Sequence, residues 1–167
     1  MKRYTFYLMG LAAATLVAGG CGYSTHRPFR SDVTTVYVAP FGSKEFRRRI
    51  EMNLTEAIKK RIQMDTPYRL ADQKTADTLL RGEVLEVKQA TLGRDFRFTD
   101  MPRETQLTLI VSFQWKDLRS GDILVERQRW LQTCDYSPLV GETDFDGLNG
   151  AVDRMAETIV EQMMTDW

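Results

Sequence analysis

Cys21 is the residue of this chain whose surroundings point most directly to a chemical modification. Lys2 and Arg3 carry positive charge, and an uncharged, mostly apolar run follows from Tyr4 to Val17. That run is too short to span a bilayer comfortably, but it has the length of a secretory h-region. Small residues then lead into Cys21. We expect export and attachment of a diacylglyceryl group to the thiol. Acylation of the new amine would supply the further chain that stable anchoring needs.

Two other interpretations of this segment remain open. Ala18 and Gly20 also fit ordinary signal peptidase, which would release an unanchored protein. An uncleaved membrane anchor is disfavoured by the length of the apolar run. Under the preferred interpretation, residues 1–20 are a signal peptide, 21–32 a lipidated N-terminal tether and 33–167 one α+β domain.

The remaining thiol and the single imidazole do not suggest catalysis. Thiol chemistry would need a base such as His26 beside Cys134, but His26 lies in the expected tether. One free thiol and one histidine also make a metal site of such ligands implausible. The chain has no nucleophile elbow, phosphate-binding glycine loop or zinc-protease motif. We therefore expect a protein that is not an enzyme and that needs no cofactor beyond the covalent lipid.

The segment from Gly93 to Arg103 offers a candidate binding site. If it is extended, Arg94 and Phe96 lie on one side and Arg97 on the other. Guanidinium groups suit phosphate because their donors form a planar fork, and aromatic rings suit acyl chains or an apolar wall. Arg94, Phe96 and Arg97 are therefore candidates for contact with a phosphorylated amphiphile or a partner. The alternative is a hairpin tip with solvated arginines.

Composition narrows the class of protein further. Loss of residues 1–20 leaves 21 basic residues against 23 acidic ones, so no excess of positive charge points to nucleic acid. The remaining length suits one domain with a sizeable core. With Cys21 lipidated, Cys134 has no partner for an internal disulfide, and stability must come from that core.

The pattern of apolar residues predicts the elements of that domain. Strands are expected at 33–39, 68–70, 78–92, 106–116 and 123–132, and helices at 44–63 and 143–167. We expect a turn at 41–43 with Ser43 as helix N-cap, a close approach or bulge at Gly82, and irregular chain from Thr133 to Gly141. Thr143 and Asp146 would form a capping box.

The strand at 106–116 carries the clearest signal. Odd positions from Leu107 to Trp115 are apolar, while even positions are polar except Ile110. A period of two with one wet face is typical of an antiparallel sheet that is covered on one side. The fold class is therefore α+β: a two-layer sandwich with two helices packed on one face of a mixed, largely antiparallel four- to five-stranded sheet. Trp115 and Val111 should face the helices.

The two predicted helices carry opposite charge. The first is basic and the second acidic. If they pack side by side, their flanking charges pair, which we favour for the expected sandwich. If they lie apart, the basic helix could meet anionic lipid or peptidoglycan.

A series of short motifs runs along nearly all of the mature chain. They are, in chain order, Cys21-Gly22-Tyr23 with Arg27, Val36-Tyr37-Val38, Ala76-Asp77 before Leu80-x-Gly82-x-Val84, Glu104-Thr105-Gln106-Leu107, Asp117 with Gly121, and Ala156 with Ile159. In the order of these motifs the chain resembles the LPS-assembly lipoprotein family.

This resemblance implies an α+β domain that is lipid-anchored on the periplasmic side of the outer membrane. It also implies that the domain plugs a large β-barrel translocon protein and helps deliver lipopolysaccharide to the surface. The alternative is an envelope lipoprotein that activates a cell-wall synthase or forms part of a secretion complex. Such domains can share the strand–helix–strand opening.

Overall fold

A computed structural model describes residues 29–44, 49–95 and 101–164. Its described strands form one mixed six-stranded sheet in the order β3-β1-β4-β5-β6, with β2 paired to β4. The strands are β1 (Thr35–Val38), β2 (Gly42–Ser43), β3 (Arg69–Leu70), β4 (Thr78–Asp95), β5 (Met101–Asp117) and β6 (Ile123–Tyr136). The predicted signal peptide, Cys21, His26, Phe96 and Arg97 lie outside the described residues.

Strand pairing confirms the predicted mixed sheet. β1 pairs in parallel with β3 and β4, and β2 pairs in parallel with β4. The long strands β4, β5 and β6 are antiparallel neighbours. The sixth strand is β2, where the sequence predicted a turn. Ser43 pairs with Val84, so its assignment as a helix N-cap is wrong.

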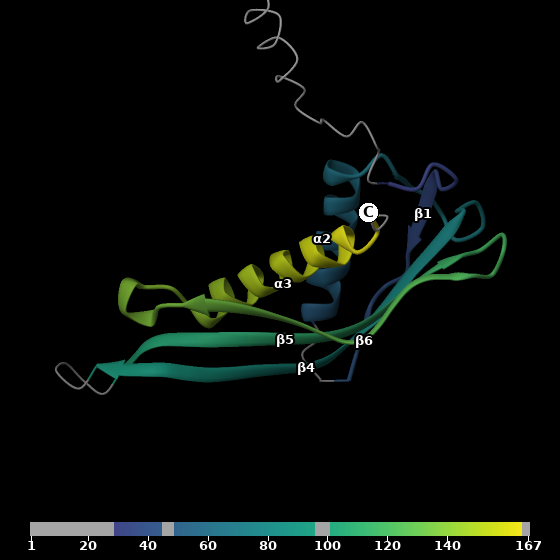
Figure 1. The fold of residues 1–167 in the computed structure, drawn as a ribbon. Coiled ribbons are helices and arrows are strands. Elements are labelled where there is room, and N and C mark those ends of the chain that lie inside the picture. Colours follow the sequence, from purple (N-terminus) through teal and green to yellow (C-terminus); the bar gives the residue numbers. More distant parts are fainter. Residues whose placement is uncertain (1–28, 45–48, 96–100, 165–167) are drawn as a thin grey trace, which may run out of the picture.

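Both helices cover the same face of the sheet (Figure 1). α2 spans Ile50–Asp65 and α3 spans Asp144–Glu161. Thr143 and Asp146 form the predicted capping box, in which the Thr143 hydroxyl accepts from the Asp146 N–H. The first predicted helix began earlier than α2, which starts at Ile50. The second predicted helix ended later than α3, which stops at Glu161. Neither described helix is long and apolar enough to cross a membrane.

The apolar faces of the two helices meet one side of the sheet to make the core. Trp115 and Val111 are buried there, as the alternation predicted. The helical residues of this core recur every three or four positions, and they are Ile50, Leu54, Ile58 and Ile62 on α2 and Val152, Met155, Ile159 and Met163 at α3 and its end. An ion pair of 3.5 Å between Arg61 and Glu157 joins the two helices, as side-by-side packing requires.

Gly82 marks a close approach, as predicted. A side chain there would overlap the ring of Phe41, and its Cβ would lie 2.6 Å from the carbonyl oxygen of Ser112. Phe41 is buried and fills the space over the glycine. Its N–H donates to the Thr55 hydroxyl at 3.0 Å, which connects the chain after β1 to α2.

The long strands extend further than the sequence indicated. β6 continues through Thr133 to Tyr136, where irregular chain was expected, and β4 continues to Asp95. The extension of β6 follows from burial, because Cys134 and Tyr136 lie beneath α3. The Tyr136 hydroxyl donates to Asp144 Oδ1 at 2.5 Å, and Gln89 donates to the same hydroxyl. Figure 1 shows the resulting long hairpin projecting away from the end of the sheet that holds β1.

Candidate functional site: the open face of the sheet

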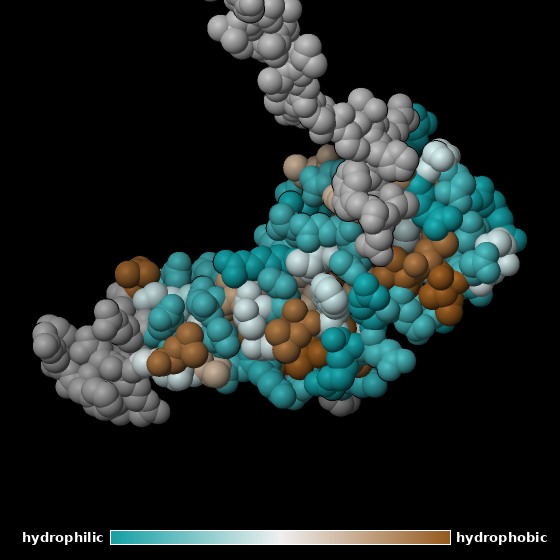
Figure 2. All heavy atoms as spheres, viewed as in Figure 1, coloured by the Kyte–Doolittle hydropathy of each residue, from teal (hydrophilic) through white to brown (hydrophobic). Residues whose placement is uncertain are grey.

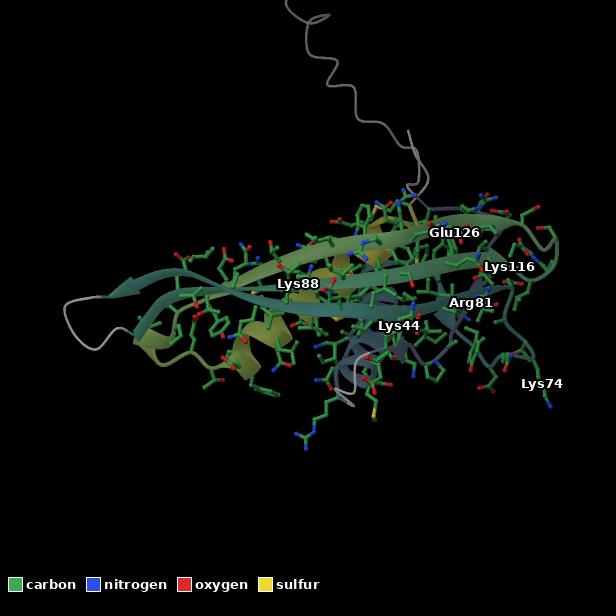
Figure 3. All side chains as sticks on the ribbon, turned by 90° about the horizontal axis from the view of Figure 1, so that it is seen from below. Lys44, Lys74, Arg81, Lys88, Lys116 and Glu126 are labelled. Atoms are coloured by element: carbon green, nitrogen blue, oxygen red, sulfur yellow. The ribbon has the colours of Figure 1, made fainter. Side chains whose placement is uncertain are left out.

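The face of the sheet opposite the two helices is open and carries mostly polar side chains. In Figure 3 this face is turned toward the viewer, and Arg81, Lys88, Lys116 and Glu126 project from its strands. The even-numbered residues of β5 supply its centre, because alternate side chains of a strand point to opposite faces. We call this surface the open face and define it by Arg81, Glu83, Glu86 and Lys88 of β4, Gln106, Ser112, Gln114 and Lys116 of β5, and Glu126 and Arg129 of β6.

One row of hydrogen-bonded side chains crosses all three long strands. Arg81, Gln114 and Glu126 are register partners on β4, β5 and β6. The Arg81 Nε and Nη2 atoms donate to Gln114 Oε1 at 3.2 and 2.9 Å. Gln114 Nε2 in turn donates to Glu126 Oε1 at 3.4 Å. The row fixes the orientation of its polar groups without removing them from solvent.

Further along the open face, ion pairs hold the carboxylates of β4. Glu86 lies 3.1 Å from Lys88 Nζ and 3.6 Å from Arg129 Nη2. Glu83 lies 3.6 Å from Lys44 Nζ. Exposed pairs of this kind contribute little to stability, typically under about 1 kcal/mol. Their charges therefore remain available to a partner surface at small energetic cost.

A shallow depression of about 500 Å³ lies on the open face, lined by residues that include Lys44, Arg81, Glu83, Gln114 and Glu126. Its mixed charges and wide mouth suit a polar surface better than a small apolar ligand, because ligand pockets are mostly enclosed and apolar. Among the described residues no cluster of histidine, cysteine or carboxylate side chains could hold a metal ion. The open face can thus offer hydrogen bonds and ion pairs over a broad area.

Ile110 is the one apolar residue among the even-numbered positions of β5 from Gln106 to Lys116. It is only 3% exposed although it belongs to the open face. Its register partners are Glu86 on β4 and Leu131 on β6, and the register shift between Val84 and Glu86 leaves Leu85 as an extra residue beside it. Such bulges increase local twist, so neighbouring side chains can close over a small apolar one.

A buried carboxylate stabilises the turn between β5 and β6. Asp117 Oδ1 accepts from the backbone N–H of Arg119 at 2.7 Å, and Arg119 Nη2 lies 3.1 Å from Asp117 Oδ2. These hydrogen bonds from Arg119 lower the pKa of Asp117 to about 2. Arg119 Nη2 also donates to the Asp32 carbonyl at 2.7 Å, which ties the turn to the N-terminal part of the chain.

Asp77, the residue before β4, joins the start of that strand to β1. Its Oδ2 accepts from the Thr35 hydroxyl and N–H, both at 2.9 Å, and from the Thr34 N–H. Hydrogen bonding by the Thr35 side chain is the largest cause that lowers the pKa of Asp77. The β1–β4 junction therefore depends on an ionised carboxylate.

The open face is defined by residues other than those proposed from the sequence. The backbone of Arg94 lies in β4, paired with Pro102, while Phe96 and Arg97 lie outside the described residues. Cys21 and His26 also lie outside them. Cys134 is buried beneath α3. The open face itself was not proposed as a site, although the wet, even-numbered row of β5 was a signal that could have located it.

Helices on one face and an exposed polar sheet on the other define a small α+β domain suited to binding another macromolecule. The lipopolysaccharide-assembly (LptE) family model matches residues 33–167, so the chain belongs to that family. This family comprises non-enzymatic outer-membrane lipoproteins that take part in lipopolysaccharide assembly. No curated protein matches the sequence.

Solved structures share the fold at low sequence identity. The protein CT253 from Chlamydia trachomatis has a TM-score of 0.53 at 12% identity, over 77% of this chain and 96% of that one. The PelC dodecamer from Paraburkholderia phytofirmans has a TM-score of 0.53 at 14% identity, over 84% and 96%. Lipoprotein B from Nitrosomonas europaea has a TM-score of 0.51 at 12% identity, over 77% and 81%. These likenesses confirm the α+β fold.

Proposed function

We propose that this protein is lipid-anchored through Cys21 on the periplasmic side of the outer membrane. There it plugs a β-barrel translocon and helps deliver lipopolysaccharide to the cell surface. The observation that carries the proposal is the open face, because the interior of a large membrane barrel is polar and water-filled. A plug needs a broad polar surface to lie against that wall, and the open face is one.

The length of the hairpin supports the same function. β4 has 18 residues, which at roughly 3.3 Å per residue corresponds to about 60 Å. A bilayer with its headgroups is about 40–45 Å thick. The part of β4 beyond its pairing with β1 and β2, from Leu85 to Asp95, spans about 36 Å. It is therefore long enough to cross the hydrocarbon core, which is about 30 Å thick, while α2 and the start of the domain stay near the periplasmic mouth of the barrel.

Hydrogen bonds between the hairpin and α3 hold the hairpin in its extended position. Gln89 of β4 and Asp144 of α3 both bond to the buried Tyr136 hydroxyl of β6. Burial is the first cause that raises the pKa of Tyr136, and the Asp144 carboxylate adds to it. A hairpin braced in this way can enter a lumen without folding back on itself.

Arg94, Phe96 and Arg97 remain our candidates for contact with lipopolysaccharide or with the barrel. Their residue types suit an amphiphile that carries phosphates, as the sequence indicates. The backbone of Arg94 lies near the end of β4, where it pairs with Pro102.

Affinity purification from detergent-solubilised envelopes tests the proposal. The full chain, tagged at its C-terminus, should copurify with LptD, the partner with which the family works. A variant with Arg81→Glu, Lys88→Glu and Lys116→Glu should lose that partner while keeping its unfolding midpoint. A control with Lys60→Glu, Lys74→Glu and Arg154→Glu has the same change in charge away from the open face and should retain it.

The alternatives give different results in the same experiment. Copurification of a cell-wall synthase, or self-association into a ring without a barrel, would replace our proposal with an envelope lipoprotein of another complex. Equal loss of the barrel from both variants would mean that overall charge, rather than the open face, governs the association.

A further inference from the structure

Exposed apolar side chains gather where β6 begins and α3 ends. Ile123 is 52% exposed and Met164 36% exposed, although both are large and apolar. Leu124 and Val125 of β6 are partly buried beside them, and Met163 is buried. Figure 2 shows hydrophobic residues grouped on this part of the surface, to the right of the C-terminal end of α3. We call Ile123, Leu124, Val125, Met163 and Met164 the anchor corner.

The anchor corner lines both sides of a groove between β6 and the end of α3. The groove has a volume of about 560 Å³ and is also lined by Arg30, Trp115, Glu126, Arg127 and Glu161. Its charged side chains are two arginines and two glutamates, so their formal charges cancel. An apolar patch with a neutral rim suits a zwitterionic surface, because burial of apolar area rather than net charge would drive the contact.

The chain from the N-terminus reaches the domain at this same corner. Phe29 forms an antiparallel bridge with Met164. Its ring packs edge-on against Tyr68 with centroids 5.7 Å apart, and Tyr68 in turn contacts Trp115 at 5.9 Å. The Arg30 N–H donates to the Tyr68 hydroxyl at 3.0 Å, and Arg119 holds the Asp32 carbonyl. These contacts fix the chain to the core from Phe29 onward.

The docking of Phe29 limits the distance between the domain and an anchor on Cys21. Eight peptide units separate the two residues, and a fully extended chain of that length spans at most about 28 Å. The anchor corner is bridged directly to Phe29, so it is the apolar surface that a short tether keeps nearest the membrane. Val140, which is 77% exposed, lies after the far end of β6.

We propose that the anchor corner rests on the phospholipid surface of the leaflet that holds the Cys21 lipid and so orients the domain. This inference rests on the lipid anchor of the proposed function. Ile123 and Met164 would enter the region between headgroups and acyl chains, while Arg30 and Arg127 meet phosphates and Glu161 meets an amine. The distal hairpin would then point away from the point of attachment.

Photo-crosslinking of the full-length protein in cells with labelled phospholipids tests this orientation. A benzophenone amino acid replaces Ile123 in one variant and Val140 in the control, which carries a more exposed apolar residue at the distal end. We expect about tenfold more lipid adduct from position 123, which corresponds to about 1.4 kcal/mol in favour of the docked orientation. Both variants should keep the unfolding midpoint of the wild type.

Labelling with a fatty acid separates failure of the inference from failure of the anchor. If the wild type incorporates no labelled fatty acid, the lipid anchor is wrong and the inference falls with it. If it incorporates fatty acid but positions 123 and 140 give equal lipid adducts, or no lipid adducts, only the inference is overturned. A protein adduct at position 123 in place of lipid would identify the anchor corner as an interface with a partner and would also overturn it.

A second pair of variants tests the role of the tether contacts. Phe29→Ser removes the ring that packs on Tyr68 and should reduce the lipid adduct at position 123, because the freed chain allows the domain to tilt. Phe145→Ser removes an exposed ring at the start of α3 and should leave that adduct unchanged. An undiminished adduct in the Phe29 variant would contradict the orienting role of the docked chain.

Discussion

The thiol of Cys134 lies directly against the backbone of Gly150. A methyl group on that glycine would lie 2.6 Å from the sulfur. Three residues earlier on the same helix, a side chain at Gly147 would overlap the ring of Tyr136. These two glycines allow α3 to approach β6 closely enough to bury Cys134 and Tyr136. The thiol that the sequence left without a catalytic partner is therefore part of the packing between helix and sheet.

Gly150→Ala should accordingly lower the free energy of unfolding by about 1–3 kcal/mol, the range for overpacking a core. Cys134→Ala in the same chain should recover much of that loss, because it removes the sulfur that the new methyl group would meet. Urea denaturation of the two single variants and the double variant measures this coupling. Gly93→Ala is the control, since nothing lies within 4 Å of a Cβ there. Additive effects would contradict the contact.

Trp115→Ala should lower the free energy of unfolding by roughly 3–5 kcal/mol, as expected for a large aromatic residue removed from a core. Trp115 is 1% exposed and contacts Tyr68. Lys116→Ala, the next residue on the open face, should change stability by less than about 0.5 kcal/mol. Similar losses for the two variants, measured by chemical denaturation, would mean that the faces of β5 are assigned incorrectly.

The alternation on β5 allowed this burial to be predicted from the sequence, and the helical spacing from Ile50 to Ile62 allowed the same for α2. Both patterns are local, with periods of two and about four residues. The predicted end of β6 was wrong because the true end depends on tertiary packing. Thr133 to Tyr136 has no strong local strand signal, and its pairing with β5 depends on burial of Cys134 and Tyr136 by a helix that follows in the chain.

The open face was missed as a site for a related reason. Its row from Arg81 to Glu126 joins residues of three strands, and their meeting depends on register. Register is set by the whole sheet, including bulges beside Leu85 and within β6 that one sequence does not reveal. The alternation of arginine and phenylalanine at 94–97 is a local pattern and could be read from the sequence. These side chains lie outside the part of the chain that the structure describes.

The pH dependence of stability should depend strongly on Asp117. Its pKa in the folded protein is about 2, below the ordinary value of 3.8, because Arg119 hydrogen-bonds to the ionised carboxylate. A lowered folded-state pKa contributes stability that is present above the unfolded pKa and lost as pH falls through the folded value. Wild type should therefore lose stability between about pH 5 and pH 2.

Asp117→Asn should flatten that part of the stability profile. At neutral pH it should cost about 1.5–3 kcal/mol, the range for hydrogen bonds to a charged group. Arg119→Gln removes the donor that is the largest cause of the shift and should flatten the profile in the same direction. Thermal denaturation at closely spaced pH values measures both effects. A profile for Asp117→Asn that is parallel to wild type would contradict the assignment.

Binding of lipopolysaccharide tests the candidate residues at 94–97. Glutamate in place of both Arg94 and Arg97 should weaken binding of lipopolysaccharide more than binding of a neutral detergent. The difference should shrink as salt rises, because exposed charges are screened over about 8 Å at physiological ionic strength. Phe96→Ala should weaken binding with little salt dependence, since its contribution is apolar area.

Lys60→Glu with Lys74→Glu is the matched control for the arginine variant and should leave lipopolysaccharide binding unchanged. Equilibrium binding at several salt concentrations provides the comparison. If the arginine variant binds lipopolysaccharide normally but no longer copurifies with the barrel, these residues belong to the protein interface. If neither association changes, Arg94 and Arg97 are solvated residues of a hairpin end.

Site-specific crosslinking from the open face inside intact cells tests the central claim most directly. A photoreactive amino acid at Lys88 or at Lys116 should give an adduct with the barrel protein, because the account places the open face against the polar wall of the barrel. The same group at Met52, which is 67% exposed on α2, should give much less of it. The absence of a barrel adduct from both open-face positions, in variants that fold normally, would contradict the account.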